Sequence, residues 1–414
     1  MRGNGPRRPA AARFAIPLAA ALAVSAAAGC AAPSSVDPGV GGVLRVGSAL
    51  ALTGDLAEGV LTEQGYQFCV DTVNARGGVQ VGGRRLTLSI SYADDQSSPV
   101  TSARLVREFS DEGIKLILGP YGSAATAADA AVAQSAGQVM IASAGADDTI
   151  FSHGYTQVFG VQSPASSYAS AIIDAVVSEA RPGPKTLAVV SADDNFSQVV
   201  ARFAVEDGQL LGLSVFPLIT FPASSTDLTS VVTRLRAEHP DLVIESGHLV
   251  EGIALVVAAA QYRLRPQGIG ETVAPTDPTF TRSLGALAEG VIGSAQWVPG
   301  QSGQDEYFGT AADYARDFRA KFGYTPEYHA AEASAACLAL VLAVEHAGST
   351  NPVAVAAALR NLGAPSFFGT LQFAADGQDT THPMSVIQIQ HGHPVTIWPE
   401  ALAQAPLRWP MAPP

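Results

Sequence analysis

The feature that most constrains the fold is a strand, turn and helix pattern that recurs along most of the chain. Short apolar runs at residues 43–52, 85–92 and 114–118 end at Gly, Pro or Asp, and a helical pattern follows each of them. Most of these runs are apolar along their length, as expected when helices cover both faces of a parallel sheet. A second series of the same kind starts near Tyr168. The pattern therefore predicts an α/β fold with two doubly wound sheets.

Later segments depart from this regular alternation. One strand is predicted at 214–221 and one at 291–298, and the chain then predicts helices at 307–322, 329–346 and 352–361. Short strands around hairpin turns are predicted at 367–373, 384–390 and 395–398.

Residues 114–135 combine a buried strand, a tight turn at Gly119-Pro120 and a helix of small residues. Amides in the first turn of a helix have no partner inside the helix, and the helix dipole adds partial positive charge there. A carboxylate can therefore bind at Tyr121, Gly122 and Ser123 without a lysine or arginine, with the Ser123 hydroxyl as a further donor. The alternative is that Ser123 only caps its own helix.

Other strand ends belong to the same kind of edge, because doubly wound sheets bind ligands at the carboxyl ends of their strands. They are residues 144–147, Asn195-Phe196 and Gly247-His248. Phe196 is either a ligand contact or a core aromatic residue, and His248 is either a ligand contact or a helix-capping histidine.

Charge and composition exclude one class of partner. The 414 residues carry a formal net charge of -13, and the chain is 47% hydrophobic and 15% charged. Such a composition indicates a globular chain long enough for two domains. The acidic balance argues against nucleic acid or an anionic lipid surface as the main partner.

Residues 1–29 have the layout of a secretory signal, with four arginines before an apolar run that is too short to span a membrane. The run ends Ala27-Ala28-Gly29-Cys30, which looks like a lipoprotein signal whose cysteine becomes the acylated first residue. Residues 30–42 are predicted to form a tether. We therefore expect an exported protein, lipid-anchored to the outer face of the cytoplasmic membrane or in the periplasm. The alternative is an ordinary signal cut nearby, with Cys30 incidental.

Two further cysteines, Cys69 and Cys337, each lie in an apolar helical pattern, which favours two buried free thiols. A disulfide between them is the alternative in an oxidising compartment, but the sequence does not show whether they are close.

Patterns for catalysis are missing from the sequence. There is no Gly-x-Ser-x-Gly elbow, no phosphate-binding loop, no His-Glu-x-x-His and no Gly-x-Gly-x-x-Gly after a strand. His391 and His393 on a hairpin tip, and the acidic pairs at strand ends, are interpreted as surface and capping residues. We predict a protein that is not an enzyme and has no cofactor and no metal site.

Five motifs occur in a recognisable order and spacing. They are Leu52-Thr53-Gly54, Asn74-Ala75-Arg76-Gly77-Gly78, Tyr92-Ala93-Asp94-Asp95, Leu118-Gly119-Pro120-Tyr121-Gly122-Ser123 and Ala288-Glu289-Gly290-Val291. This set resembles the leucine/isoleucine/valine-binding family, the extracytoplasmic receptors of amino-acid ABC importers. The similarity covers residues 43 to about 399.

The resemblance implies a type I periplasmic-binding-protein fold, in which two lobes joined by three crossings close over a ligand. Lobe one would be residues 43–161 and 300–361, and lobe two residues 162–299 and 362–400. The ligand carboxylate would bind at the turn from Tyr121 to Ser123. Its ammonium would bind at the next strand end, which consists of Ala144, Gly145, Ala146 and Asp147.

Several positions differ from the family pattern. Ala146 stands where the family has a threonine, so Asp147 or a carbonyl must replace the hydroxyl, or the ligand differs. A lobe-two tyrosine falls on Phe196 and another aromatic position falls on His248. The lobe-two acid that pairs with the ammonium aligns poorly, and Glu271 is our candidate for it. These differences argue against simple leucine or valine specificity.

We therefore expect a solute-binding lipoprotein of an ABC importer that captures an amino acid or a related small carboxylate. Its partners would be that ligand and an ABC permease, with membrane contact only through the lipid anchor and no nucleic acid. The alternative is a ligand-sensing receptor of the same fold coupled to a signalling or assembly partner.

Overall fold

A computed structural model describes residues 42–56 and 58–411 of the chain. The predicted signal peptide, the predicted acylation site Cys30 and nearly all of the predicted tether lie outside the described residues, so these predictions stay predictions.

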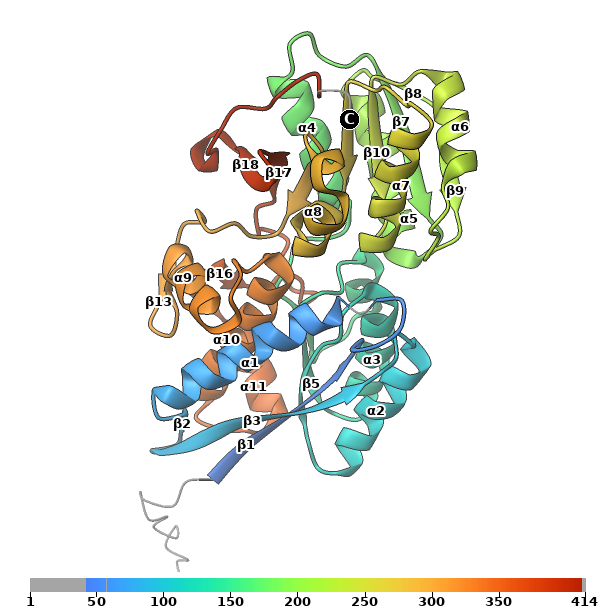
Figure 1. Ribbon diagram of the computed structural model, residues 1–414. Coiled ribbons are helices and arrows are strands. Elements are labelled where there is room, and N and C mark those ends of the chain that lie inside the picture. The colour runs from blue at the N-terminus through green and yellow to red at the C-terminus, as the bar shows by residue number, and fades with distance from the viewer. Residues whose placement is uncertain (1–41, 57, 412–414) are drawn as a thin grey trace, which may run out of the picture. The chain divides into compact units, whose positions relative to one another are not determined.

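The first sheet contains six strands in the order β2-β3-β1-β4-β5-β6, and only β2 runs antiparallel to its neighbour (Figure 1). The strands are β1 (Gly42–Leu50), β2 (Val79–Val81), β3 (Arg84–Asp94), β4 (Leu116–Leu118), β5 (Val139–Ala142) and β6 (Val158–Gly160). The helices between them are α1 (Gly59–Ala75), α2 (Pro99–Asp111), α3 (Ser123–Ser135) and the 3-10 helix η1 (Asp148–His153). The strand order changes direction at β1, so the ends of β1 and β4 flank a switch point where such sheets bind ligands.

The second sheet contains eight strands in the order β18-β17-β12-β11-β10-β7-β8, with β9 also paired to β7. The strands are β7 (Thr186–Ala192), β8 (Ser214–Val215), β9 (Ile219–Phe221), β10 (Leu242–Ser246), β11 (Gly268–Glu271), β12 (Ile292–Ala295), β17 (Ser385–Gln390) and β18 (His393–Trp398). The helices are α4 (Ser166–Glu179), α5 (Asn195–Leu210), α6 (Thr229–Glu238), α7 (Leu249–Gln261) and α8 (Pro278–Leu284), with the 3-10 helices η2 (Ala274–Thr276), η3 (Gly285–Ala288) and η4 (Glu400–Leu402). Here the order changes direction at β7, beside β10.

Helices cover both faces of each sheet, and the strands bury alternate residues on opposite faces. On β4, Leu116 and Leu118 belong to the core beneath α1, whereas Ile117 packs into the core beneath α2 and α3. On β7, Leu187 and Val190 likewise belong to two different core clusters on opposite faces of the sheet. The nearly continuous apolar runs in the sequence follow from this two-sided burial.

The remaining elements are β13 (Gln304–Asp305), β14 (Gly309–Thr310), α9 (Ala311–Phe322), α10 (Tyr328–Ala347), α11 (Pro352–Arg360), β15 (Gly363–Ser366) and β16 (Gly369–Gln372). Helix α10 packs against α1 so closely that a Cβ at Gly65 would lie 2.2 Å from the carbonyl oxygen of Ala330. Among the described residues, α10 is the one helix long and apolar enough to suit a membrane span, but most of it is buried as a core helix is.

Two predicted elements need correction, and strand β11 was not predicted. The helix expected at 307–322 begins only at Ala311, because Thr310 and Asp313 form a capping box there and β14 precedes it. The strand expected at 214–221 is broken into β8 and β9. The sequence pattern does not predict β11. Two of its residues are glycines because a Cβ at Gly268 would collide with Trp409 and a Cβ at Gly270 would collide with Ile172.

Near the C-terminus the chain passes from the first sheet to the second. The hairpin β15–β16 stays with α9, since Phe367 stacks on Tyr314 at 4.1 Å between ring centroids. Gln378 then forms a bridge with Gly160 of the first sheet, and β17 is the next strand of the second sheet. The lobe boundaries themselves stay a prediction.

Cys69 and Cys337 form a disulfide that joins α1 to α10, with 6.3 Å between their Cα atoms. The expectation of two free thiols is therefore wrong. Both helical patterns suggested burial correctly, but the close packing of α1 on α10 is a tertiary contact that neither pattern contains.

Candidate functional site

The first half of the site lies where β4 ends and α3 begins. Gly122 has φ 90°, a conformation that favours glycine, and its N–H donates to the carbonyl of Ala144 at 3.0 Å. The Gly122 amide is therefore occupied. The amides left for an anion are those of the first turn of α3, which lack partners inside the helix.

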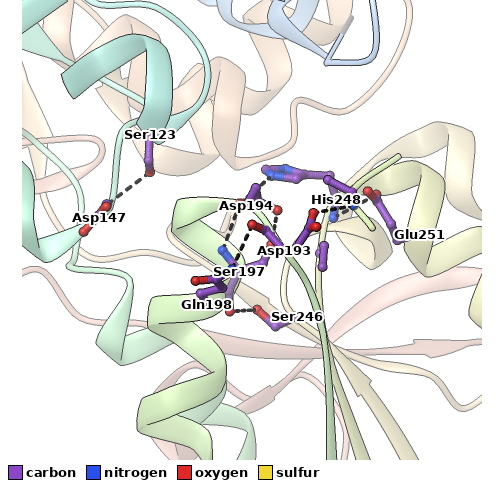
Figure 2. Close-up of polar contacts among 12 residues, drawn as sticks. Ser123, Asp147, Asp193, Asp194, Ser197, Gln198, Ser246, His248 and Glu251 are labelled. Carbon is purple, nitrogen blue, oxygen red and sulfur yellow. Dashed lines mark hydrogen bonds and ion pairs between the residues drawn. The ribbon is translucent and has the colours of Figure 1, made fainter. Parts of the chain in front are cut away.

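Ser123 is the first residue of α3 and does not cap it, because Gly122 takes the cap position. Its hydroxyl oxygen instead accepts a hydrogen bond from the N–H of Asp147 at 3.1 Å (Figure 2). This bond ties the start of α3 to the loop after β5. The hydroxyl hydrogen remains available for a ligand acceptor.

Two residues of the loop after β5, Gly145 and Asp147, stabilise the loop itself. The Asp147 carboxylate accepts the N–H of Thr149 at 2.9 Å and so caps η1. A Cβ at Gly145 would lie 2.3 Å from the Oγ1 of Thr126, so this residue packs under α3.

The second half of the site lies where β10 ends and α7 begins. His248 takes the N-cap position of α7, and its N–H donates to Glu251 at 3.3 Å. Its Nε2 lies 3.7 Å from Asp194 Oδ1 in an ion pair, and Figure 2 shows the two side chains pointing toward one another. Its Nδ1 lies 3.4 Å from the hydroxyl of Tyr121, so the ring of His248 contacts residues from both sheets.

The ion pair between His248 and Asp194 determines the charge in this half of the site. Burial alone would lower the pKa of His248, but the adjoining Asp194 and the charge of Glu58 raise it to about 9. Burial opposes ionisation of Asp194 as well, yet the contact with His248 lowers its pKa to about 2. At neutral pH the site therefore holds an imidazolium paired with a carboxylate.

A second contact between the two edges comes from Glu58. Its carboxylate accepts the N–H of Leu249 at 3.3 Å, in the first turn of α7. Burial raises the pKa of Glu58, with the charges of His248 and His329 opposing that rise.

A cavity of about 20 Å³ lies between the two halves of the site. It is lined by Tyr121, Gly122, Ser123, Ala144, Ala146, Tyr168, Phe196, His248, Val273, Tyr328, His329 and Glu332. Seven of the residues predicted from the sequence thus come together. We call this space the inner cavity.

A larger space of about 660 Å³ lies beside it and is lined by Glu58, Leu249, Asp277, Tyr324 and neighbouring residues. Glu58 and Leu249 form its border toward His248, so we interpret this space as the entrance to the inner cavity. The inner cavity is the candidate binding site despite its smaller volume, because the starts of α3, α5, α7 and α10 and most of the predicted residues converge there.

Glu271, the predicted lobe-two partner of an ammonium, does not line the inner cavity. Its carboxylate lies against α7, where a Cβ at Gly252 would be 2.6 Å from it. It is fully buried beside Glu245 on the adjacent strand, and burial holds the pKa of both carboxyl groups well above the usual range.

The sequence interpretation missed Tyr328, His329 and Glu332, and it favoured a packing role for Tyr168. All four line the inner cavity. Glu332 could have been noticed as a lone acid in the apolar first part of α10. The aromatic residues carry no such signal, because buried rings at helix starts are common in cores.

The described residues contain no group of three or more His, Cys, Asp or Glu placed to hold a metal ion.

Two doubly wound sheets with a cavity at their contacting carboxyl edges define the class of bilobed ligand-binding proteins. Residues 43–394 match the family model described as periplasmic binding protein, and the chain belongs to this family. The Leu/Ile/Val-binding protein homolog 8 of Brucella abortus is 24% identical over 408 residues, which cover 94% of this chain and 98% of that protein. The expected resemblance to the leucine/isoleucine/valine-binding proteins is thus confirmed.

Solved structures confirm the two-lobed fold. The leucine-binding protein LivK of Thermotoga maritima superposes with a TM-score of 0.77 at 19% identity, covering 86% of this chain and 98% of that one. A solute-binding protein of an ABC transporter from R. palustris, in complex with benzoate, superposes with a TM-score of 0.75 at 18% identity. The superposition covers 88% of this chain and 98% of that one.

Proposed function

We propose that this protein is the extracytoplasmic solute-binding subunit of an ABC importer and captures an amino acid or a related small carboxylate in the inner cavity. The observation that carries the proposal is that two helix starts from different sheets, at Ser123 and His248, line one cavity, and that Tyr121 beside Ser123 contacts His248. It acts by binding and release, without chemical conversion of the ligand.

A carboxylate suits this arrangement for two reasons. The first turn of α3 offers amides and the hydroxyl of Ser123, and His248 adds a positive charge from the other edge. Two similar proteins are described with ligands of this kind, leucine for LivK and benzoate for the R. palustris protein. Both of these ligands carry a carboxylate.

Entry of such a ligand requires the two edges to separate. The inner cavity holds about 20 Å³, which is room for roughly one water molecule. Contacts of Tyr121 with His248 and of Glu58 with Leu249 hold the edges together. We infer that the ligand enters through the larger space when these contacts open, and that its own contacts then support closure.

Attachment to the membrane is proposed through acylated Cys30, with a permease as the recipient of the ligand. Mass spectrometry of the exported protein would test the anchor, since an acylated N-terminal cysteine differs by mass from the product of an ordinary signal cleavage.

Calorimetry with the purified protein tests the binding function. The panel contains aliphatic and aromatic amino acids, their deaminated acids and benzoate, and at least one member should give saturable heat and a rise in Tm. No heat and no thermal shift across the panel would overturn the proposal. His248→Gln serves as the site variant and should weaken binding, whereas His153→Gln, at an exposed position outside the inner cavity, should not.

A further inference from the structure

Six aromatic side chains form a closed ring around the inner cavity. Ring centroids lie 5.1 Å apart for Tyr168 and Phe196, 5.6 Å for Phe196 and His248, and 6.1 Å for His248 and Tyr121. The circuit continues at 5.1 Å from Tyr121 to His329, 4.0 Å from His329 to Tyr328 and 6.5 Å from Tyr328 back to Tyr168. The walls of the cavity are therefore largely aromatic, and the faces of the four Tyr and Phe rings attract organic cations.

Glu332, in the second turn of α10, is the one carboxylate that lines this cavity. Its side chain is fully buried, and neither carboxylate oxygen has a hydrogen-bond partner within the part of the chain that is described. Buried carboxylates without partners are costly and rare, so each one needs an explanation.

The neighbouring acid shows the contrast. Glu327 caps α10 and accepts N–H bonds from His329 at 2.7 Å and Ala330 at 2.8 Å. Glu332 lies within the helix, where the backbone offers no free N–H. Burial, and secondarily the charge of Glu327, raises the pKa of Glu332 well above its usual range.

The other groups expected to hold an ammonium already accept one hydrogen bond each or lie outside the cavity lining. The carbonyl of Ala144 accepts from Gly122, and the carbonyl of Ala146 accepts from Ala165 at 2.7 Å. Glu271 lies against α7, outside the cavity lining. Glu332 is thus the strongest acceptor in the cavity that lacks a partner.

We propose that Glu332, within the aromatic ring, binds the ammonium group of the ligand, and that this contact selects amine-bearing carboxylates over their deaminated analogues. The inference rests on the proposed function and deepens it. The ligand would lie with its carboxylate toward Ser123 and His248 and its ammonium toward Glu332, which places the acid on the helix that packs with the first sheet. An ammonium offers three donors to two carboxylate oxygens, and the pair forms in a site shielded from water.

Paired ligands test the inference by calorimetry. L-leucine is compared with 4-methylpentanoate, and L-phenylalanine with 3-phenylpropanoate, on the wild-type protein, Glu332→Gln and the control Glu345→Gln. Glu345 lies on the same helix but outside the cavity, where it bonds Tyr307 and Gln80. The wild type and the control should bind the amine-bearing member of a pair about tenfold or more tightly, and Glu332→Gln should reduce this preference to about threefold or less.

Different failures have different meanings. If the wild type prefers the deaminated acids, or if Glu332→Gln keeps the full preference for the amine, the role of Glu332 is wrong while the binding function stands. If the wild type binds no carboxylate at all, the proposed function fails, and this inference fails with it. Should Glu332→Gln not fold, judged by its thermal unfolding, Glu332→Met offers a side chain of similar length without polar atoms and must show the same loss of preference.

Discussion

The two sheets contribute to the inner cavity in chemically different ways. At the end of β4 the contribution is mainly backbone: a glycine conformation at Gly122, the free amides of a helix start and one small hydroxyl at Ser123. At the end of β10 it is mainly side chain: an imidazolium at His248 held by Asp194. The first kind of contact needs only a main-chain geometry, whereas the second depends on which residues occupy a few positions.

This difference separates recognition of the carboxylate, which every acidic ligand carries, from recognition of the rest of the ligand. Backbone amides recognise a carboxylate whatever the rest of the molecule is. Side chains at the second edge and along α10 can change while the fold is kept. We therefore expect ligand identity to follow Phe196 and Glu332, and the general preference for a carboxylate to follow Gly122 and Ser123, with the charge of His248 supporting it.

The largest expected effect concerns stability, because within the described residues only the first lobe has a disulfide. Replacing Cys69 and Cys337 by alanine should lower the free energy of unfolding by about 2–5 kcal/mol, since the link closes a long loop between buried helices. Urea unfolding of the variant, and of the wild type with reductant, measures the loss.

A change below about 0.5 kcal/mol would show that the packing of α1 on α10 is sufficient without the link. Selective early unfolding of the first lobe would strengthen the contrast between the lobes, and a uniform shift would weaken it.

Gly122→Val should damage both the fold and the binding site. A valine at φ 90° is strained by about 1–3 kcal/mol, and its Cβ would lie 3.3 Å from Leu56. The matched control is Gly113→Val, which has φ 81° and open space around its Cβ. Both variants should lose stability in urea unfolding, but only Gly122→Val should lose binding in calorimetry, by about tenfold or more. Equal affinities in the two variants would remove the backbone turn from the site.

The contrast between the edges also explains what could be predicted from the sequence. The strand, turn and helix at 114–135 predicted the backbone half of the site, because turn geometry and helix starts are local properties. The same holds for most strands and helices. The glycines Gly268 and Gly270 made β11 hard to recognise in the sequence. They are glycines because Trp409 and Ile172, which are distant in the sequence, occupy the space where their side chains would lie.

Other parts of the site depend on tertiary contacts and could not be predicted in this way. The pairing of Cys69 with Cys337 and the approach of Glu332 to the cavity both require that α10 packs on α1. Sequence interpretation chose Glu271 by its place in a family pattern, and only the register of β10 and β11 shows that its carboxylate lies against α7.

His248→Gln tests the side-chain half through pH. The pKa of His248 is about 9 in the folded protein against an ordinary value of 6.5, so its contribution is complete below 6.5 and is lost as pH rises through 9. The pKa of Asp194 is about 2 against 3.8, so its contribution is present above 3.8 and is lost as pH falls through 2. Wild type should therefore exceed the variant in unfolding free energy by about 1–2 kcal/mol more at about pH 6 than at about pH 9.5.

The exposed His153 provides the control for that experiment, since His153→Gln should show no such difference between the two pH values. A constant gap between wild type and His248→Gln across this range would mean that His248 stabilises the edge by packing against Phe196 and Tyr121 instead of by charge.

Ser123→Ala has the smallest expected effect and separates the two roles of this hydroxyl. The variant leaves the buried N–H of Asp147 without its acceptor, which should cost about 1 kcal/mol of unfolding free energy, whereas Ser135→Ala at the other end of α3 should cost less. If affinity for the bound carboxylate falls as well, by about fivefold, the serine contacts the ligand directly. If stability falls and affinity is unchanged, the serine only positions the loop, and the first edge binds the anion through main-chain amides alone. The second outcome would make the contrast between a backbone edge and a side-chain edge complete.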